Sequence, residues 1–182
     1  MAPLDSASRK VLMWTARAAI TRAIGAEVPA FDAQSPPPCD LRAGAFVTLR
    51  IKGALRGCIG YPDPDRPLID VIERCSVSAA ISDPRFPSLT AGEWNDVDVE
   101  LSILGAIEPV DHIRDVIIGR HGLIVESGRR RGLLLPQVAL EWRWDAVEFA
   151  AQTCAKAGLP RDAWQSGAAL FRFEAEVFGE TE

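Results

Sequence analysis

The sequence predicts an α+β fold in which a mainly antiparallel sheet is flanked by helices. Two patterns predict this class. Some segments repeat apolar residues at helical spacing, and others alternate apolar and polar residues, as strands with one buried and one wet face do. The 182 residues are 48% hydrophobic and 25% charged, an ordinary globular composition, and this length is enough for one core. We therefore predict a single domain over residues 1–182.

Three segments have a one-sided apolar stripe with cap or stop residues at their ends. We predict helices over residues 5–24, 67–82 and 145–157. Gly25 and Gly158 supply left-handed stops for the first and third helix. Pro84 ends the second helix, because a proline disfavours helical backbone at the residue before it.

Six segments have the composition or alternation of strands. We predict strands over residues 45–51, 55–60, 97–103, 123–126, 133–135 and 171–177. The residues Lys52–Ala54 turn the first strand back into the second as a hairpin. Thr90 and Glu93 have the spacing of a capping box, which predicts one short turn of helix. A proline-rich link, Gln34–Cys39, follows the first helix and is too stiff to continue it.

Charge and cysteine spacing disfavour several functions. The net charge is −5, whereas a nucleic-acid binder usually has a basic balance. The run Arg129–Arg131 is interpreted as the solvated tip of a hairpin, or as a dock for an acidic partner. The four cysteines are too widely spread for a zinc ribbon or an iron–sulfur site, so we predict no metal and no cofactor. No apolar run of membrane-spanning length and no secretory signal are recognised, which predicts a cytoplasmic protein.

The hexapeptide Leu55–Gly60 reads Leu-Arg-Gly-Cys-Ile-Gly and is the strongest motif of the chain. It resembles the signature of the AMMECR-domain family. Further segments resemble that family in the same order and at similar spacing: Gly44–Thr48, Asp83–Pro87, Ile118–Leu123, Gly132–Val138 and Glu141–Asp145. The resemblance covers about Lys10 to Phe178.

The resemblance implies a fold with a second, smaller lobe and places the hexapeptide near a cleft between the lobes. It also implies a role as the first component of the AmmeMemoRadiSam system, whose other components are a Memo-type protein and a radical SAM protein. These two proteins are the partners we expect, together with a small-molecule or protein substrate.

Cys58 is the candidate reactive group of the hexapeptide. It would act as a nucleophile, a radical-accepting thiol or a tether for substrate, with Arg56 as the cation that favours the thiolate. Gly57 and Gly60 would let a ligand or another backbone approach closely. The alternative interpretation is a small buried hydrophobe between strands, with glycines required by a bulge.

His121 is the candidate partner of this thiol. Its segment Gly119–Gly122 suggests a tight turn, and an imidazole near neutral pH suits a general base for Cys58. The alternative is a histidine that closes a loop by a hydrogen bond. Glu141 would line a pocket or accept a hydrogen bond from His121, unless it is a solvated helix residue.

Asp83 and Arg85 follow the second helix in a polar and aromatic loop. The guanidinium of Arg85 has the geometry to clamp a carboxylate or a phosphate. The alternative is that Asp83 closes a turn and Phe86 fills the core.

Three functions remain open at this point. The first is an enzyme or enzyme subunit acting through Arg56, Cys58 and His121 in a modification system. The second is a non-catalytic adaptor that binds substrate or partner proteins. The third, nucleic-acid binding, is the least favoured by the charge of the chain.

Overall fold

The computed structural model describes residues 3–27 and 41–180. The chain forms two compact units, one made of Met1–Ile103 with Glu176–Glu182 and the other of Leu104–Ala175. The proline-rich link Gln34–Cys39 lies outside the described residues. The prediction of a single domain with a cleft between two lobes stays a prediction.

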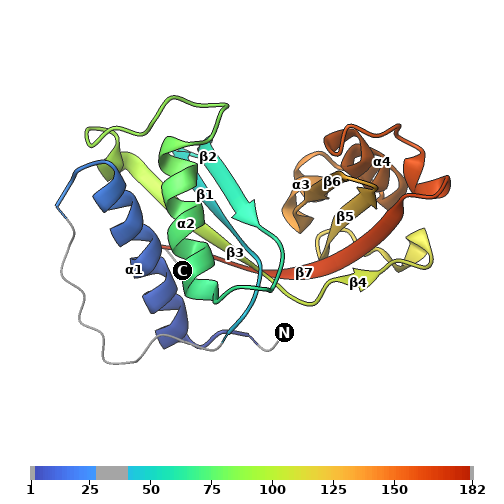
Figure 1. Ribbon diagram of the computed structural model, residues 1–182, viewed down its shortest axis with the longest axis horizontal. Coiled ribbons are helices and arrows are strands. Elements are labelled where there is room, and N and C mark those ends of the chain that lie inside the picture. The colour runs from blue at the N-terminus through green and yellow to red at the C-terminus, as the bar shows by residue number, and fades with distance from the viewer. Residues whose placement is uncertain (1–2, 28–40, 181–182) are drawn as a thin grey trace. The chain divides into compact units, whose positions relative to one another are not determined.

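The first unit is a sheet with two helices on it, and Figure 1 shows α1 and α2 side by side over the strands β1, β2 and β3. In chain order its elements are α1 (Ser6–Ala23), β1 (Ala45–Ile51), β2 (Ala54–Tyr61), α2 (Leu68–Ile81), the 3-10 helix η1 (Trp94–Asp96) and β3 (Val97–Leu104). The strand order is β2-β1-β3-β7, so β2 lies at the edge. The last residues of β7 (Ala169–Gly179) belong to this unit.

Alternation along the strands decides which face of this sheet the helices cover. Val47 and Leu49 of β1 and Val99 and Leu101 of β3 are fully or almost fully buried, and they join the apolar stripes of α1 and α2 in one core. The intervening residues, such as Thr48, point to the opposite face. The apolar residues of the alternation form a buried face as predicted, but the opposite face is not wet throughout, because Thr48 and Ser102 are 4% and 0% exposed.

The β1–β2 hairpin contains a turn and a bulge. Lys52 and Gly53 both have positive φ angles, 51° and 79°, which form the tight two-residue turn that suits the twist of paired strands. Beyond the turn, Arg50 lies opposite Leu55, but Leu49 lies opposite Gly57. Arg56 is therefore an extra residue in β2, and the bulge shifts the register of every later residue of the strand by one.

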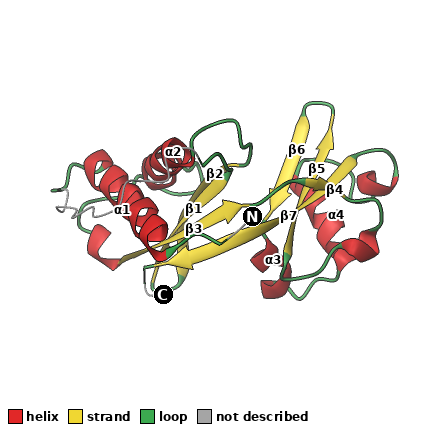
Figure 2. Ribbon diagram, turned by 90° about the horizontal axis from the view of Figure 1, so that it is seen from below, coloured by secondary structure: helices red, strands yellow, loops and turns green. Residues whose placement is uncertain are grey.

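The second unit also has helices on an antiparallel sheet, and Figure 2 shows α4 lying against β5 and β6. Its elements are β4 (Glu108–Pro109), the 3-10 helix η2 (Ile113–Asp115), β5 (His121–Ser127), β6 (Arg130–Leu134), α3 (Pro136–Glu141), α4 (Ala146–Lys156), the 3-10 helix η3 (Ala163–Gln165) and the first residues of β7. The strand order is β7-β5-β6, and β4 pairs with β7. Phe149, Ala150 and Cys154 of α4 are fully buried in its core.

The predicted ends of the long helices are confirmed. The carboxylate of Asp145 accepts a hydrogen bond from the Glu148 N–H at 2.8 Å, as an N-cap does. Gly25 and Gly158 have φ angles of 73° and 69° just beyond α1 and α4. The α+β class is confirmed as well. None of the helices in the described ranges is long and apolar enough to cross a bilayer.

The α-helix α3 was not predicted by its range, although a helical position was one interpretation of Glu141. α3 has six residues, Pro136–Glu141, and is followed after Trp142 by a left-handed residue, Arg143, whose φ is 55°. The N–H of Trp144 donates to the Ala139 carbonyl at 2.9 Å, which closes the helix as a glycine-terminated helix would be closed. Arginine carries no such signal in the sequence.

Candidate functional site

Cys58 lies in the middle of β2, the edge strand of the first unit. It pairs with Thr48 of β1, and the Thr48 hydroxyl is 3.4 Å from the Cys58 Sγ. Cys58 is partly exposed, whereas Cys75 and Cys154 are buried. Of the cysteines that the structure describes, Cys58 is thus the most accessible.

The backbone of Cys58 is held from outside the sheet by the loop that follows α2. Its N–H donates to Oδ2 of Asp83 at 2.9 Å, and Nη2 of Arg85 donates to its carbonyl at 2.9 Å. These groups face away from β1, at a position where an inner strand would find a neighbouring strand. Two side chains therefore supply the donor and acceptor that the edge lacks, which also blocks pairing with another chain there.

Asp83 and Arg85 form a close ion pair. The Arg85 Nη2 lies 2.6 Å from the Asp83 Oδ2, and the Arg85 Nε lies 2.9 Å from Oδ1. The Asp83 side chain is 1% exposed and that of Arg85 is 47% exposed. Hydrogen bonding from Arg85 holds the pKa of Asp83 well below its ordinary value, although burial opposes this shift. The same hydrogen bond raises the pKa of Arg85, although burial opposes this shift as well. Arg85 is accordingly a cation beside the thiol.

Arg56 has a structural partner of its own. Its Nε lies 3.0 Å from Oε1 of Glu93, and its Nη1 donates to the Pro87 carbonyl at 2.9 Å. Glu93 also accepts from the Thr90 N–H at 3.0 Å, as the capping-box spacing predicted. The hydrogen bond from Arg56 is the main cause that lowers the pKa of Glu93 to about 2. Arg56 thus fastens the loop over residues 87–93 to the bulge of β2.

The glycines of the hexapeptide lie against other parts of the first unit. A Cβ on Gly57 would lie 2.2 Å from the carbonyl oxygen of Ala79 in α2, and a Cβ on Gly60 would lie 2.2 Å from the ring of Phe46. Real Cβ atoms essentially never come this close to another atom. Close packing within the chain therefore accounts for both glycines without a bound ligand.

His121 and Glu141 belong to the second unit, whereas Cys58 belongs to the first. The predicted pairing of Cys58 with His121 stays a prediction. His121 begins β5, so the predicted turn ends two residues earlier than expected, at Arg120. Glu141 is the last residue of α3 and is exposed.

The ring of His121 makes a hydrogen bond inside its own unit. Its Nδ1 accepts from the Ile117 N–H at 3.0 Å, and the residue is 5% exposed. Burial lowers the pKa of His121, with the charges of Arg172 and Arg120 as further causes, so the ring is neutral at pH 7. A neutral imidazole has one acceptor nitrogen, which the Ile117 N–H already occupies. This is the loop-closing role that stood as the alternative to a general base.

Two contacts of this site were not predicted from the sequence, that of Thr48 with Cys58 and that of Glu93 with Arg56. The position of Thr48 opposite the thiol depends on the bulge at Arg56, which carried no recognised signal. Among the residues that the structure describes, no group of three or more His, Cys, Asp or Glu side chains is placed to hold a metal ion.

Fold and site together define a class of α+β protein. Its edge strand carries a cysteine whose backbone is hydrogen-bonded by two side chains of a neighbouring loop. The AMMECR1 family model matches residues 13–178, most of the chain. The chain therefore belongs to the AMMECR1 family, and the predicted resemblance is confirmed.

Similar proteins come from archaea. A protein of Methanothermobacter thermautotrophicus is 46% identical over 187 residues, covering 98% of this chain and 97% of that protein. One from Methanococcoides burtonii is 48% identical over 144 residues, covering 76% and 72%. The crystal structure of an uncharacterised protein from Pyrococcus horikoshii matches with a TM-score of 0.87 and 39% identity, covering 97% of this chain and 93% of that one.

Proposed function

We propose that the chain is a component of a modification system that includes a Memo-type protein and a radical SAM protein. In this proposal it meets its substrate or partner at Cys58, within a cleft near Leu55–Gly60. The membership of the AMMECR1 family supports the association, and the geometry around Cys58 supports the site.

The observation that carries this site is a partly exposed thiol on a backbone fixed from both sides. β1 holds Cys58 on one side and the pair of Asp83 and Arg85 holds it on the other. A reactive group must be positioned within about 0.5 Å by its surroundings to act efficiently. Arg85, ion-paired with Asp83, also places its guanidinium against the Cys58 backbone.

A second candidate function is a non-catalytic adaptor that binds substrate or partner proteins. It is favoured by the engagement of the His121 acceptor nitrogen with Ile117 and by the packing that fills the space beside Gly57. In the adaptor, Asp83 and Arg85 would serve only to cap the strand edge.

Alkylation tests whether the thiol is available. In the native protein, iodoacetamide is expected to modify Cys58 roughly tenfold faster than Cys75 or Cys154, because these two are buried and burial raises the pKa of Cys75 to about 11. Peptide mass spectrometry after timed quenching measures the three rates. A Cys58 rate no higher than that of Cys154 would remove the proposed site.

Genetic rescue distinguishes the enzyme from the adaptor. In cells that lack the gene, a catalytic thiol requires that Cys58→Ser fail to restore the modified product while the purified variant unfolds like the wild type. An adaptor requires that Cys58→Ser restore it, whereas charge reversal at Arg129–Arg131 abolishes co-purification with the Memo-type or radical SAM partner. Restoration by both variants would contradict both forms of the proposal.

A further inference from the structure

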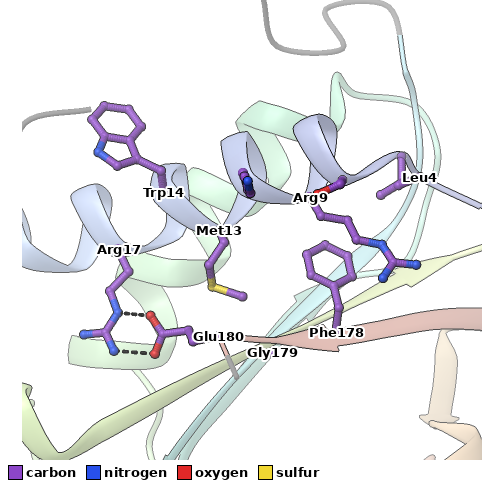
Figure 3. A pocket seen from close by; sticks show the side chains of 10 residues that line it. Leu4, Arg9, Met13, Trp14, Arg17, Phe178, Gly179 and Glu180 are labelled. Carbon is purple, nitrogen blue, oxygen red and sulfur yellow. Dashed lines mark hydrogen bonds and ion pairs between the residues drawn. The ribbon is translucent and has the colours of Figure 1, made fainter. Parts of the chain in front are cut away.

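A groove separate from Cys58 lies on the first unit, between α1 and the end of β7. Figure 3 shows Met13 in its middle, with Arg17 and Glu180 at one side and Arg9 and Phe178 at the other. Its volume is about 730 Å³. Sites for small molecules typically measure roughly 300–1,000 Å³. The groove is thus large enough for an organic ligand.

Part of the lining is apolar. Leu4, Met13, Trp14 and Phe178 contribute to it. A methionine in such a position adapts its unbranched, polarisable side chain to ligands of different shape. These residues suit the hydrocarbon part of a ligand.

Two arginines at the groove are already neutralised. The Arg9 Nη2 lies 2.8 Å from Oε1 of Glu176, and Arg17 makes a two-pronged pair with Glu180. Both guanidinium groups also lie over aromatic rings. The Arg9 guanidinium is 5.4 Å from the centre of the Phe178 ring, and that of Arg17 is 4.2 Å from the centre of the Trp94 ring. Neither guanidinium is therefore free to bind an anionic group of a ligand.

Lys10 is the remaining cation of the groove. It is exposed, and within residues 3–27 and 41–180 its ammonium has no ion-pair partner. Among the described residues that line the groove or pair with its arginines, three cations face two carboxylates, an excess of one positive charge. An apolar floor beside one uncompensated ammonium complements a ligand with an apolar body and a single negative charge.

We propose that this groove binds a small apolar carboxylic acid, with the hydrocarbon on Met13 and Phe178 and the carboxylate on Lys10. The site is independent of Cys58 and of the proposed function. The neutralised arginines explain why a monoanion fits better than a phosphate or a dianion, which would need more than one free cation.

The probe pair is decanoate and the neutral 1-decanol, measured by methyl NMR. The chain has two methionines, Met1 and Met13, so protein labelled with 13C at the methionine methyls gives two signals, and Met13→Leu assigns them. Decanoate is expected to shift the Met13 signal in a saturable way. Lys10→Gln should weaken decanoate binding about tenfold and leave decanol binding unchanged. Lys156→Gln, an exposed lysine of the second unit, is the matched control and should change neither.

Added salt should weaken decanoate binding and not decanol binding, because the ion pair is exposed. The proposal is overturned if decanoate leaves the Met13 signal unmoved at millimolar concentration. It is equally overturned if Lys10→Gln binds decanoate as the wild type does. Unfolding curves of each variant verify that the fold is retained, and Lys10→Arg, which keeps the charge, should retain binding.

Discussion

Replacing Asp83 with alanine is expected to lower the free energy of unfolding by about 3 kcal/mol, because a buried carboxylate and its hydrogen bonds are lost together. The Cys58 N–H would lose its acceptor, and Arg85 would lose the carboxylate that holds it against the strand. Arg85→Ala should cost less, about 1–2 kcal/mol, because the Asp83 carboxylate loses its ion pair but keeps hydrogen bonds from the N–H groups of Cys58 and of residue 85. Urea unfolding at pH 7 measures both. Equal losses in the two variants would contradict the strand-capping role of Asp83.

The contribution of Asp83 should depend on pH in a defined direction. Its pKa is lower in the folded protein than in the unfolded chain, where it lies near 3.8. The stabilisation is therefore fully present above the unfolded pKa and is lost as the pH falls through the folded pKa. The difference in stability between the wild type and Asp83→Asn should be largest near pH 7 and shrink below about pH 4. The variant comparison is needed because Glu93 titrates in the acid range as well.

The bulge at Arg56 shows where prediction from the sequence reached its limit. The hairpin, its turn and the two strands followed from alternation and from Lys52 and Gly53. Counting back from the turn without a bulge pairs Cys58 with Val47, on the helix-covered face. With the bulge, Cys58 pairs with Thr48 and lies on the opposite face. Side chains have a period of two along a strand, so one extra residue decides between a core cysteine and an accessible one.

The hydrogen bonds between the hexapeptide and the Asp83 loop could not be predicted from the sequence either. Asp83 and Arg85 were predicted as candidates, but for a ligand or a turn. Their hydrogen bonds to Cys58 join residues 25 and 27 positions apart. Short-range patterns carry no information on such contacts, since these depend on how α2 returns the chain along β2. By contrast, the helix ends at Gly25 and Gly158 are local and were predicted.

The substitution Gly57→Ala is expected to destabilise the first unit by about 3 kcal/mol or more, because the new methyl group would overlap a backbone atom. The Ala79 carbonyl oxygen would be 2.2 Å from the added Cβ, and it belongs to the buried last turn of α2. Relief requires a backbone shift, either of the last turn of α2 or of β2. Gly92→Ala is the matched control, since its Cβ would meet nothing closer than 4.0 Å. That variant should change stability by less than about 0.5 kcal/mol.

Substitutions at Gly60 test whether the glycines of the hexapeptide are required by packing within the chain or by the approach of a ligand. The obstacle at Gly60 is the Phe46 ring, a side chain that a second substitution can shorten. Gly60→Ala should destabilise the fold, and Phe46→Leu in the same chain should recover part of the loss, with a coupling of about 1–3 kcal/mol in a double-mutant cycle. No second side-chain change should rescue Gly57→Ala. If Gly57→Ala instead unfolds like the wild type but fails in genetic rescue, the glycine serves an approaching ligand or partner. The packing explanation of the hexapeptide would then be wrong, and the case for Cys58 as a contact site would be stronger.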